Sequence, residues 1–178
     1  MYPVLRLVWQ MFKHRNDPSL PVRGTHVSHH VCWPWDIDLW MELNNGRTLT
    51  LFDLGRIPLA QRVGLIPALK RQGWGLTVAG STVRYRRRVR MFEAVEMRSR
   101  AVFWDDKFVY IEQSMWKRGG ECANHILLRT AVTGKGGIVP PARVMEEVDK
   151  TASAPKAPDW VAAWIAADAK RPWPPMQE

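Results

Sequence analysis

Cysteine is scarce in this chain of 178 residues, which contains only Cys32 and Cys122. Two cysteines so far apart provide neither a disulfide framework nor a CxxC metal site, so we expect a reducing, cytoplasmic location. The chain also lacks the ~20 consecutive apolar residues of a membrane-spanning helix. Its first 15 residues show no charged segment before the apolar stretch and no small-residue cleavage site, which argues against a signal peptide.

Acidic residues are also few, since 26 Lys and Arg face 17 Asp and Glu and give a net charge of +9. Such a basic chain suits nucleic acid, an anionic membrane or a polyanionic small molecule such as a coenzyme A (CoA) thioester. The excess is local, because seven arginines lie between Arg84 and Arg100. No nucleic-acid-binding motif accompanies them, so nucleic acid is the least favoured of the three partners.

The N-terminal 20 residues predict a short amphipathic helix, with Leu5, Val8, Trp9 and Phe12 on one stripe. Two interpretations remain open. The favoured one is an arm packed on the domain; the alternative is a helix lying in a membrane interface, a peripheral membrane contact.

The remaining periodicity predicts one strand, one long helix and then an antiparallel meander of four strands. Asn44 or Asn45 is a natural N-cap for the long helix, and Pro58 should kink or restart it before about Val63. Asp105-Asp106 and Arg118-Gly119-Gly120 are typical hairpin turns. The expected strands are Thr25–Trp33, Leu76–Val89, Ala94–Trp104, Lys107–Lys117 and Cys122–Thr133.

This order predicts an α+β domain in which an antiparallel sheet of five or more strands wraps around a central helix. We expect an N-terminal arm over residues 1–20, the domain over 21–150, and a linker with a C-terminal helix and tail over 151–178. That last helix, from Asp159, should pack on the domain through Trp160 and Trp164. Open strand edges then favour a homo-oligomer.

The segment from Trp35 to Asn45, Trp-Asp-Ile-Asp-Leu-Trp-Met-Glu-Leu-Asn-Asn, resembles the hotdog-fold acyl-CoA thioesterases of the 4-hydroxybenzoyl-CoA thioesterase type. The similarity continues through a thioesterase-like subgroup pattern over about residues 24–135. It implies a hotdog fold, an acyl-CoA or other acyl thioester as substrate, a dimer or tetramer, and no cofactor beyond the CoA of the substrate.

Carried over by position, the resemblance makes Asp38 the catalytic nucleophile or general base and places the oxyanion-binding amide at Asn45. The alternative for Asp38 is a residue that caps a turn of its own loop. The chemistry is consistent, because a helix N-terminus offers unpaired N–H groups to a developing oxyanion. Asn44 and Gly46 would help bind the substrate there. The family's Gly-His step is Met41-Glu42 here, so Glu42 is a second acid/base candidate or a solvent-facing residue.

The run from Arg84 to Arg90 should place Arg84, Arg86, Arg88 and Arg90 on one face of a strand. We expect Arg86 and Arg88 to bind the phosphates of the thioester carrier, with a solvated strand end as the alternative.

His26 and His30 should share the opposite face of the first strand from His29. Because this arrangement is poor for three-ligand coordination, we assign no metal site.

The leading hypothesis is therefore an acyl-CoA thioesterase that uses Asp38 and helix N-terminal amides. The alternative is a non-catalytic hotdog module that binds an acyl thioester or a protein, with a membrane contact through residues 1–15 as one form of it. Thr48, which replaces the tyrosine usual after the Asn pair, and Glu42 keep this alternative open.

Overall fold

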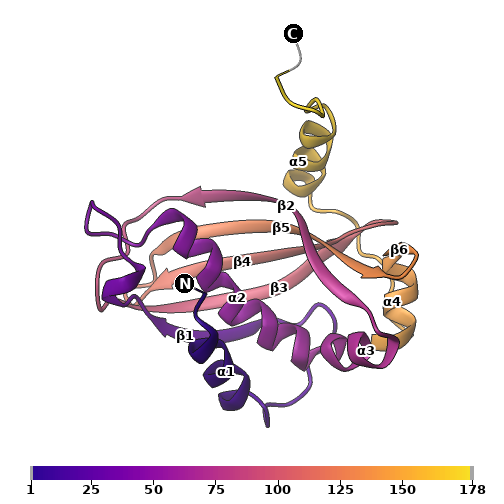
Figure 1. Cartoon of the computed structure of the whole chain (residues 1–178), viewed down its shortest axis with the longest axis horizontal. Helices are drawn as coiled ribbons and strands as arrows, with labels where there is room; N and C mark the ends of the chain where they lie inside the picture. Colours follow the sequence, from indigo (N-terminus) through magenta and orange to yellow (C-terminus); the bar gives the residue numbers. More distant parts are fainter. Residues whose placement is uncertain (1, 177–178) are drawn as a thin grey trace.

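A computed structural model of the chain describes residues 2–176 and shows an α+β domain in which a curled antiparallel sheet wraps around one long helix (Figure 1). The strand order is β1-β3-β4-β5-β2, and the short β6 pairs with β5. The helices are α1 (Val4–Lys13), α2 (Asn45–Arg62), α3 (Leu65–Gln72), α4 (Pro141–Val148) and α5 (Asp159–Ala169). The strands are β1 (His26–Val31), β2 (Gly75–Tyr85), β3 (Ala94–Trp104), β4 (Val109–Lys117), β5 (Cys122–Gly134) and β6 (Gly137–Val139).

The core lies between α2 and the sheet. Leu51, Phe52 and Leu54 of α2 are fully buried and pack against Met97 and Ile126 of the strands. Gly55 permits this close approach, since a Cβ there would lie 2.7 Å from the Met97 sulfur. The hotdog arrangement predicted by the resemblance is thus the observed fold, with additional helices at both ends.

The predicted hairpins β3–β4 and β4–β5 are confirmed. The position of β2 differs from a simple meander, because β2 pairs with β5 and leaves β1 to pair with β3. The long connection from β1 through α2 to β2 would allow β2 to pair with either β3 or β5. Only the packing of the whole domain selects β5.

The expected restart of the long helix at Pro58 is wrong, because α2 continues through Pro58 to Arg62. Proline removes a single amide donor, and burial of its ring against the core accompanies the uninterrupted helix. A further helix that the sequence pattern did not predict, α3, lies between Gly64 and Gly73. Both glycines have left-handed backbone conformations, with φ of 83° and 64°, and they separate α3 from its neighbours.

The terminal helices contact the domain in different ways. α1 packs along α2 through one face, and Leu7 reaches the core. α5 buries Val161 against the outer side of the sheet, where Trp164 meets Tyr110 with ring centroids 6.3 Å apart. This confirms the predicted packing of Trp164, whereas Trp160 stays 42% exposed beside His125.

Candidate active site

The site begins at the N-terminus of α2, whose first amides remain available to a ligand. Asn44 caps the helix, because its side-chain oxygen accepts a hydrogen bond from the Arg47 amide at 3.1 Å. The carbonyl of Asn44 accepts the Thr48 amide. Within residues 2–176, no hydrogen bond uses the amides of Asn45 and Gly46. Two donors therefore point outward at the positive end of an 18-residue helix.

Asp38 lies on the loop that leads into this helix, where an Ile37–Leu43 bridge closes a tight turn. Its Oδ1 accepts hydrogen bonds from the amides of Trp40 at 2.8 Å and Glu42 at 3.4 Å. The side chain thus stabilises its own turn, as an Asx-type residue does. Its other carboxylate oxygen accepts no hydrogen bond from the described residues.

Asp36, the first carboxylate of the pair, has a different environment because it is completely buried. Its two oxygens bind Arg6 of α1 and Arg47 of α2, each at 2.6 Å. Burial alone would raise the pKa of Asp36, but hydrogen bonds from Arg47, the Trp33 amide and Arg6 outweigh it and lower the pKa. Asp36 therefore joins α1, the loop and α2 as a permanently charged structural group.

A cavity of about 220 Å³ brings together residues that are distant in sequence. Four of the predicted site residues line it: Glu42, Asn45, Arg86 and Arg88. Asp38 is not among its lining residues, and neither are Asn44 and Gly46. The other lining residues were not predicted from the sequence: Leu43, Tyr85, Arg87, Val89 and Asn124.

The arginines reach this cavity by a route that differs from the prediction. β2 ends at Tyr85, so Arg86, Arg88 and Arg90 do not share a strand face. The amides of Arg86 and Arg87 both donate to the Ala123 carbonyl, which ends the regular ladder with β5 and starts a loop. The alternating arginines resemble a strand in sequence, but this contact turns the chain over the cavity.

Charge within the cavity is partly neutralised. The Nε of Arg88 lies 2.8 Å from an oxygen of Glu42, and the Arg88 side chain is 71% exposed. Arg87 pairs with Glu121, while no ion pair within residues 2–176 involves Arg86. Tyr85 donates a hydrogen bond to the Asn45 carbonyl at 3.3 Å. The wall facing the α2 amides thus carries guanidinium groups suited to an anionic ligand.

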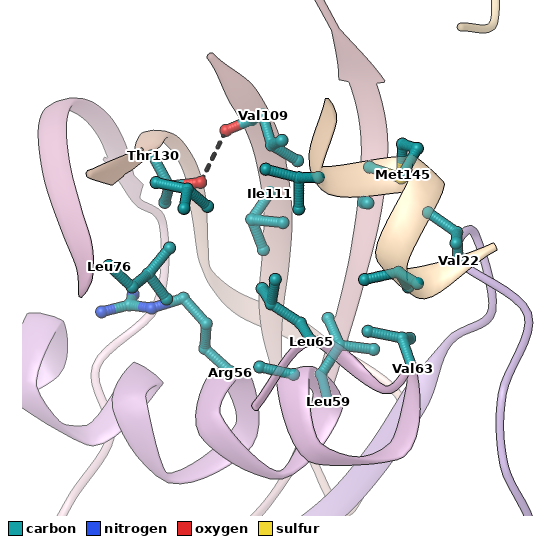
Figure 2. Close-up of a pocket in the computed structure, with 15 residues that line it drawn as sticks. Val22, Arg56, Leu59, Val63, Leu65, Leu76, Val109, Ile111, Thr130 and Met145 are labelled. Carbon is teal, nitrogen blue, oxygen red and sulfur yellow. Dashed lines mark hydrogen bonds between the residues drawn. The ribbon is translucent and has the colours of Figure 1, made fainter. Parts of the chain in front are cut away.

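A separate apolar pocket of about 60 Å³ lies under the other half of α2, closed by α4 (Figure 2). Its lining is mostly apolar, including Leu59, Ile111 and Met145, with Arg56 as its charged member. The Thr130 hydroxyl donates to the Val109 carbonyl. At a rise of about 1.5 Å per residue, Leu59 lies roughly 21 Å along the helix from Asn45. A group bound at the α2 amides would therefore have to extend along the helix to reach this pocket.

The histidines of β1 are positioned as expected, with His26 and His30 buried and His29 exposed. Within the described part of the chain, no three His, Cys, Asp or Glu side chains are grouped so that they could hold a metal ion. Burial lowers the pKa of His26 to about 4 and that of His30 to about 3. Both are neutral core groups at pH 7.

Comparison with known proteins connects this geometry to a family. Residues 32–165 match the thioesterase-like superfamily. The chain belongs to the thioesterase-like superfamily. Protein THEM6 of Xenopus laevis is 32% identical over 142 residues, which cover 79% of this chain and 67% of that protein. Protein THEM6 of Drosophila melanogaster is 24% identical, over 92% of this chain and 84% of that protein.

Solved structures of thioesterase-like proteins share the fold at low sequence identity. The probable thioesterase YbaW of Escherichia coli superimposes with a TM-score of 0.65 at 13% identity, over 72% of this chain and 99% of its own. DHNA-CoA thioesterase of Staphylococcus aureus gives 0.61 at 15% identity, over 82% and 91%. The hotdog fold of this thioesterase-like chain is therefore established by both sequence and structure. Among the described residues, no helix is long and apolar enough to cross a membrane.

Proposed function

We propose that this protein hydrolyses acyl thioesters at the N-terminus of α2. The observation that carries the proposal is the pair of unbonded amides, Asn45 and Gly46, beside an arginine-lined cavity in a thioesterase-like fold. The thioester carbonyl oxygen would accept these N–H groups, which stabilise the negative charge that develops on it. The fold and family support the reaction class, and the loop geometry supports the choice of carboxylate.

Asp38 is the carboxylate we assign to the chemistry, since one of its oxygens is free of hydrogen bonds within the described chain. It either removes a proton from a water that attacks the carbonyl carbon, or attacks that carbon itself to form a mixed anhydride, which water then hydrolyses to free the acid and Asp38. The C–S bond then breaks, and the sulfur leaves as a thiolate that takes up a proton. Glu42 lines the cavity and is the second acid/base candidate, held by its ion pair with Arg88.

Arg86 and Arg88 are the groups we assign to the carrier of the acyl group. Both line the cavity, and no described ion pair engages Arg86. A CoA ester presents phosphates, which arginine binds well through its planar array of donors. The carrier is therefore proposed to be CoA, with no cofactor beyond the substrate itself.

A homodimer completes the proposal. β2 pairs with β5 on one side, and within residues 2–176 no strand covers its other edge. An exposed edge of 11 residues favours pairing with a second copy. Because the cavity contains Tyr85 and Arg86 at the end of this strand, the partner would lie beside the site.

A second candidate function is binding of an acyl thioester without hydrolysis. The observation that favours it is that Asp38 uses one oxygen to stabilise its own turn and lies outside the cavity lining. In this case the protein would bind CoA esters at the same amides and release no thiol.

The experiment is thiol release from a panel of acyl-CoA esters by wild type and Asp38→Asn. We expect turnover to fall by roughly a hundredfold or more, because Asn cannot act as nucleophile or base. Melting temperature should stay unchanged, since Asn can still accept the turn's amide hydrogen bonds. Asp106→Asn, in an exposed hairpin turn, is the matched control and should retain full activity.

Turnover of Asp38→Asn within tenfold of wild type would contradict the assignment of Asp38. Binding of acyl-CoA without thiol release by the wild type across the panel would instead support the binding module.

A further inference from the structure

The helix α1 exposes a continuous apolar and aromatic face. Its apolar residues at positions i, i+1, i+4, i+5 and i+8 fall on one side of the helix. Each of them exposes more than half of its surface to solvent: Val4 57%, Leu5 86%, Val8 59%, Trp9 60% and Phe12 53%. We call these five residues the α1 face. Nothing within residues 2–176 covers it. The helix itself packs on the domain, as the favoured interpretation expects, but it does so through its opposite side.

The opposite side of the helix fixes α1 to the domain. Arg6 donates to Asp36 at 2.6 Å and to the Val31 carbonyl at 3.0 Å. Gln10 is buried, and the His14 ring meets His26 edge-on with centroids 4.6 Å apart. Figure 1 shows α1 on the same side of the sheet as α2, beside β1. The α1 face is thus presented to solvent by a well-anchored helix.

The exposed charges of residues 2–16 are basic, while the carboxylates that contact this segment, Asp17, Asp36 and Asp53, are engaged in ion pairs. Residues 2–16 contain no Asp or Glu, while Lys13 and Arg15 are exposed at the C-terminal end of the helix. The Arg15 guanidinium lies 3.6 Å from the centre of the Phe12 ring, which in turn stacks with Trp9. Aromatic side chains next to exposed cations are typical of helices that bind the interface of anionic membranes.

We propose that α1 docks the protein on an anionic lipid bilayer by lying in the plane of the interface. At ten residues the helix is about 15 Å long, half the thickness of the hydrocarbon core, so it cannot cross. A second copy is a poorer occupant, because residues 2–16 offer no carboxylate to pair with the partner's Lys13 and Arg15.

The apolar surface continues beyond the helix. A groove of about 490 Å³ separates the start of α1 from Trp35, which is 65% exposed and stacks on Trp33. The loop that carries Trp35 leads directly to Asp38 and the N-terminus of α2. Docking through the α1 face would therefore hold the candidate active site near the lipid surface, although the docking itself does not depend on catalysis.

The test is co-sedimentation of the full chain with vesicles of phosphatidylcholine and phosphatidylglycerol, compared with phosphatidylcholine alone. Wild type should bind the anionic vesicles more tightly, and added salt should weaken binding. The double variant Leu5→Ser/Trp9→Ser should lose roughly tenfold in affinity. The matched control is Trp173→Ser, which removes an 86% exposed tryptophan from the C-terminal tail and should bind as wild type does.

Equal binding by wild type and the double variant would overturn the proposal, as would the absence of vesicle binding by the wild type. A lower oligomer mass of the variant in light scattering, without a change in vesicle binding, would assign the face to a contact between copies and also overturn it. If the double variant proves unstable, Trp9→Ser alone should lose roughly threefold in affinity at an unchanged melting temperature.

Discussion

Two aspartates separated by a single residue have opposite roles in this structure. Asp36 is buried with its charge shared between Arg6 and Arg47, whereas Asp38 is partly exposed and caps a turn. We expect Asp36→Asn to lower the free energy of unfolding by about 3 kcal/mol, because it leaves two guanidinium groups without their buried counter-charge. Urea unfolding measures this loss.

The control for that prediction is Asp38→Asn, which should change the unfolding free energy by less than about 1 kcal/mol. Similar losses in both variants would contradict the distinction between a structural and a functional carboxylate.

Acid should destabilise the protein through two histidines of β1. His26 and His30 have pKa values of about 4 and about 3 in the fold, because burial disfavours their charged forms, against ~6.5 when unfolded. As pH falls below 6.5 the unfolded chain binds protons that the folded chain does not. Each histidine then lowers the free energy of unfolding by up to about 1.4 kcal/mol per pH unit.

Melting temperatures between pH 7 and pH 4 test this, and His30→Gln should give a shallower decline than wild type. His29→Gln, on the exposed face of the same strand, should leave the slope unchanged. A decline of equal slope in wild type and His30→Gln would contradict the prediction.

Several site residues could be predicted individually, but their grouping could not. The helix start at Asn44 and Asn45 follows from capping chemistry, and Glu42 and the arginines were candidates by residue type. Tyr85 and Asn124 carry no local signal, because they join the cavity only when β2 pairs with β5. Arginine at every second position likewise predicts a continuing strand. It could not show that β2 stops pairing with β5 where the Arg86 amide donates to the Ala123 carbonyl.

At the level of elements, the position of α2 depends on one glycine. A Cβ at Gly55 would lie 2.8 Å from the Ser99 hydroxyl, which already accepts a hydrogen bond from Gln113. We expect Gly55→Ala to lower the free energy of unfolding by about 1 kcal/mol, since overpacking exceeds the gain in helix propensity. Denaturant unfolding checks this value.

Gly119→Ala is the matched control, because a Cβ at this hairpin turn meets nothing within 4 Å. It should be neutral within about 0.5 kcal/mol. Stabilisation by Gly55→Ala would show that α2 can move away from β3 without cost.

The strands with tight turns were predictable, and the elements that depend on distant contacts were not. β3, β4 and β5 follow from alternation and from the turns between them, and their bounds are close to those expected. α3 is short, and its apolar pattern continues that of α2, so only the left-handed Gly64 marks the boundary. The strand order could not be predicted, because nothing in the sequence shows that β2 pairs with β5.

At the scale of the whole molecule, two features remain without partners in one chain. Within residues 2–176 the outer edge of β2 is unpaired, and α5 is apolar apart from Asp159 and Asp168 although Val161 is its only buried residue. Figure 1 shows α5 projecting past the β2 edge of the sheet. A helix with so few polar residues is normally enclosed, so α5 should contact more than its own sheet.

A dimer formed along β2 would satisfy both features, because each α5 would extend over the partner's sheet. Light scattering at micromolar concentration should therefore give at least twice the 20.5 kDa of one chain.

Val78→Lys, on the β2 edge, should shift the mass towards the monomer, since an edge lysine opposes strand pairing. Ile138→Lys on β6 is the matched control, because both residues are 46% exposed, and it should remain dimeric. If Val78→Lys is monomeric and keeps full thioester hydrolysis, the site does not need a partner; a monomeric wild type would refute the assembly itself.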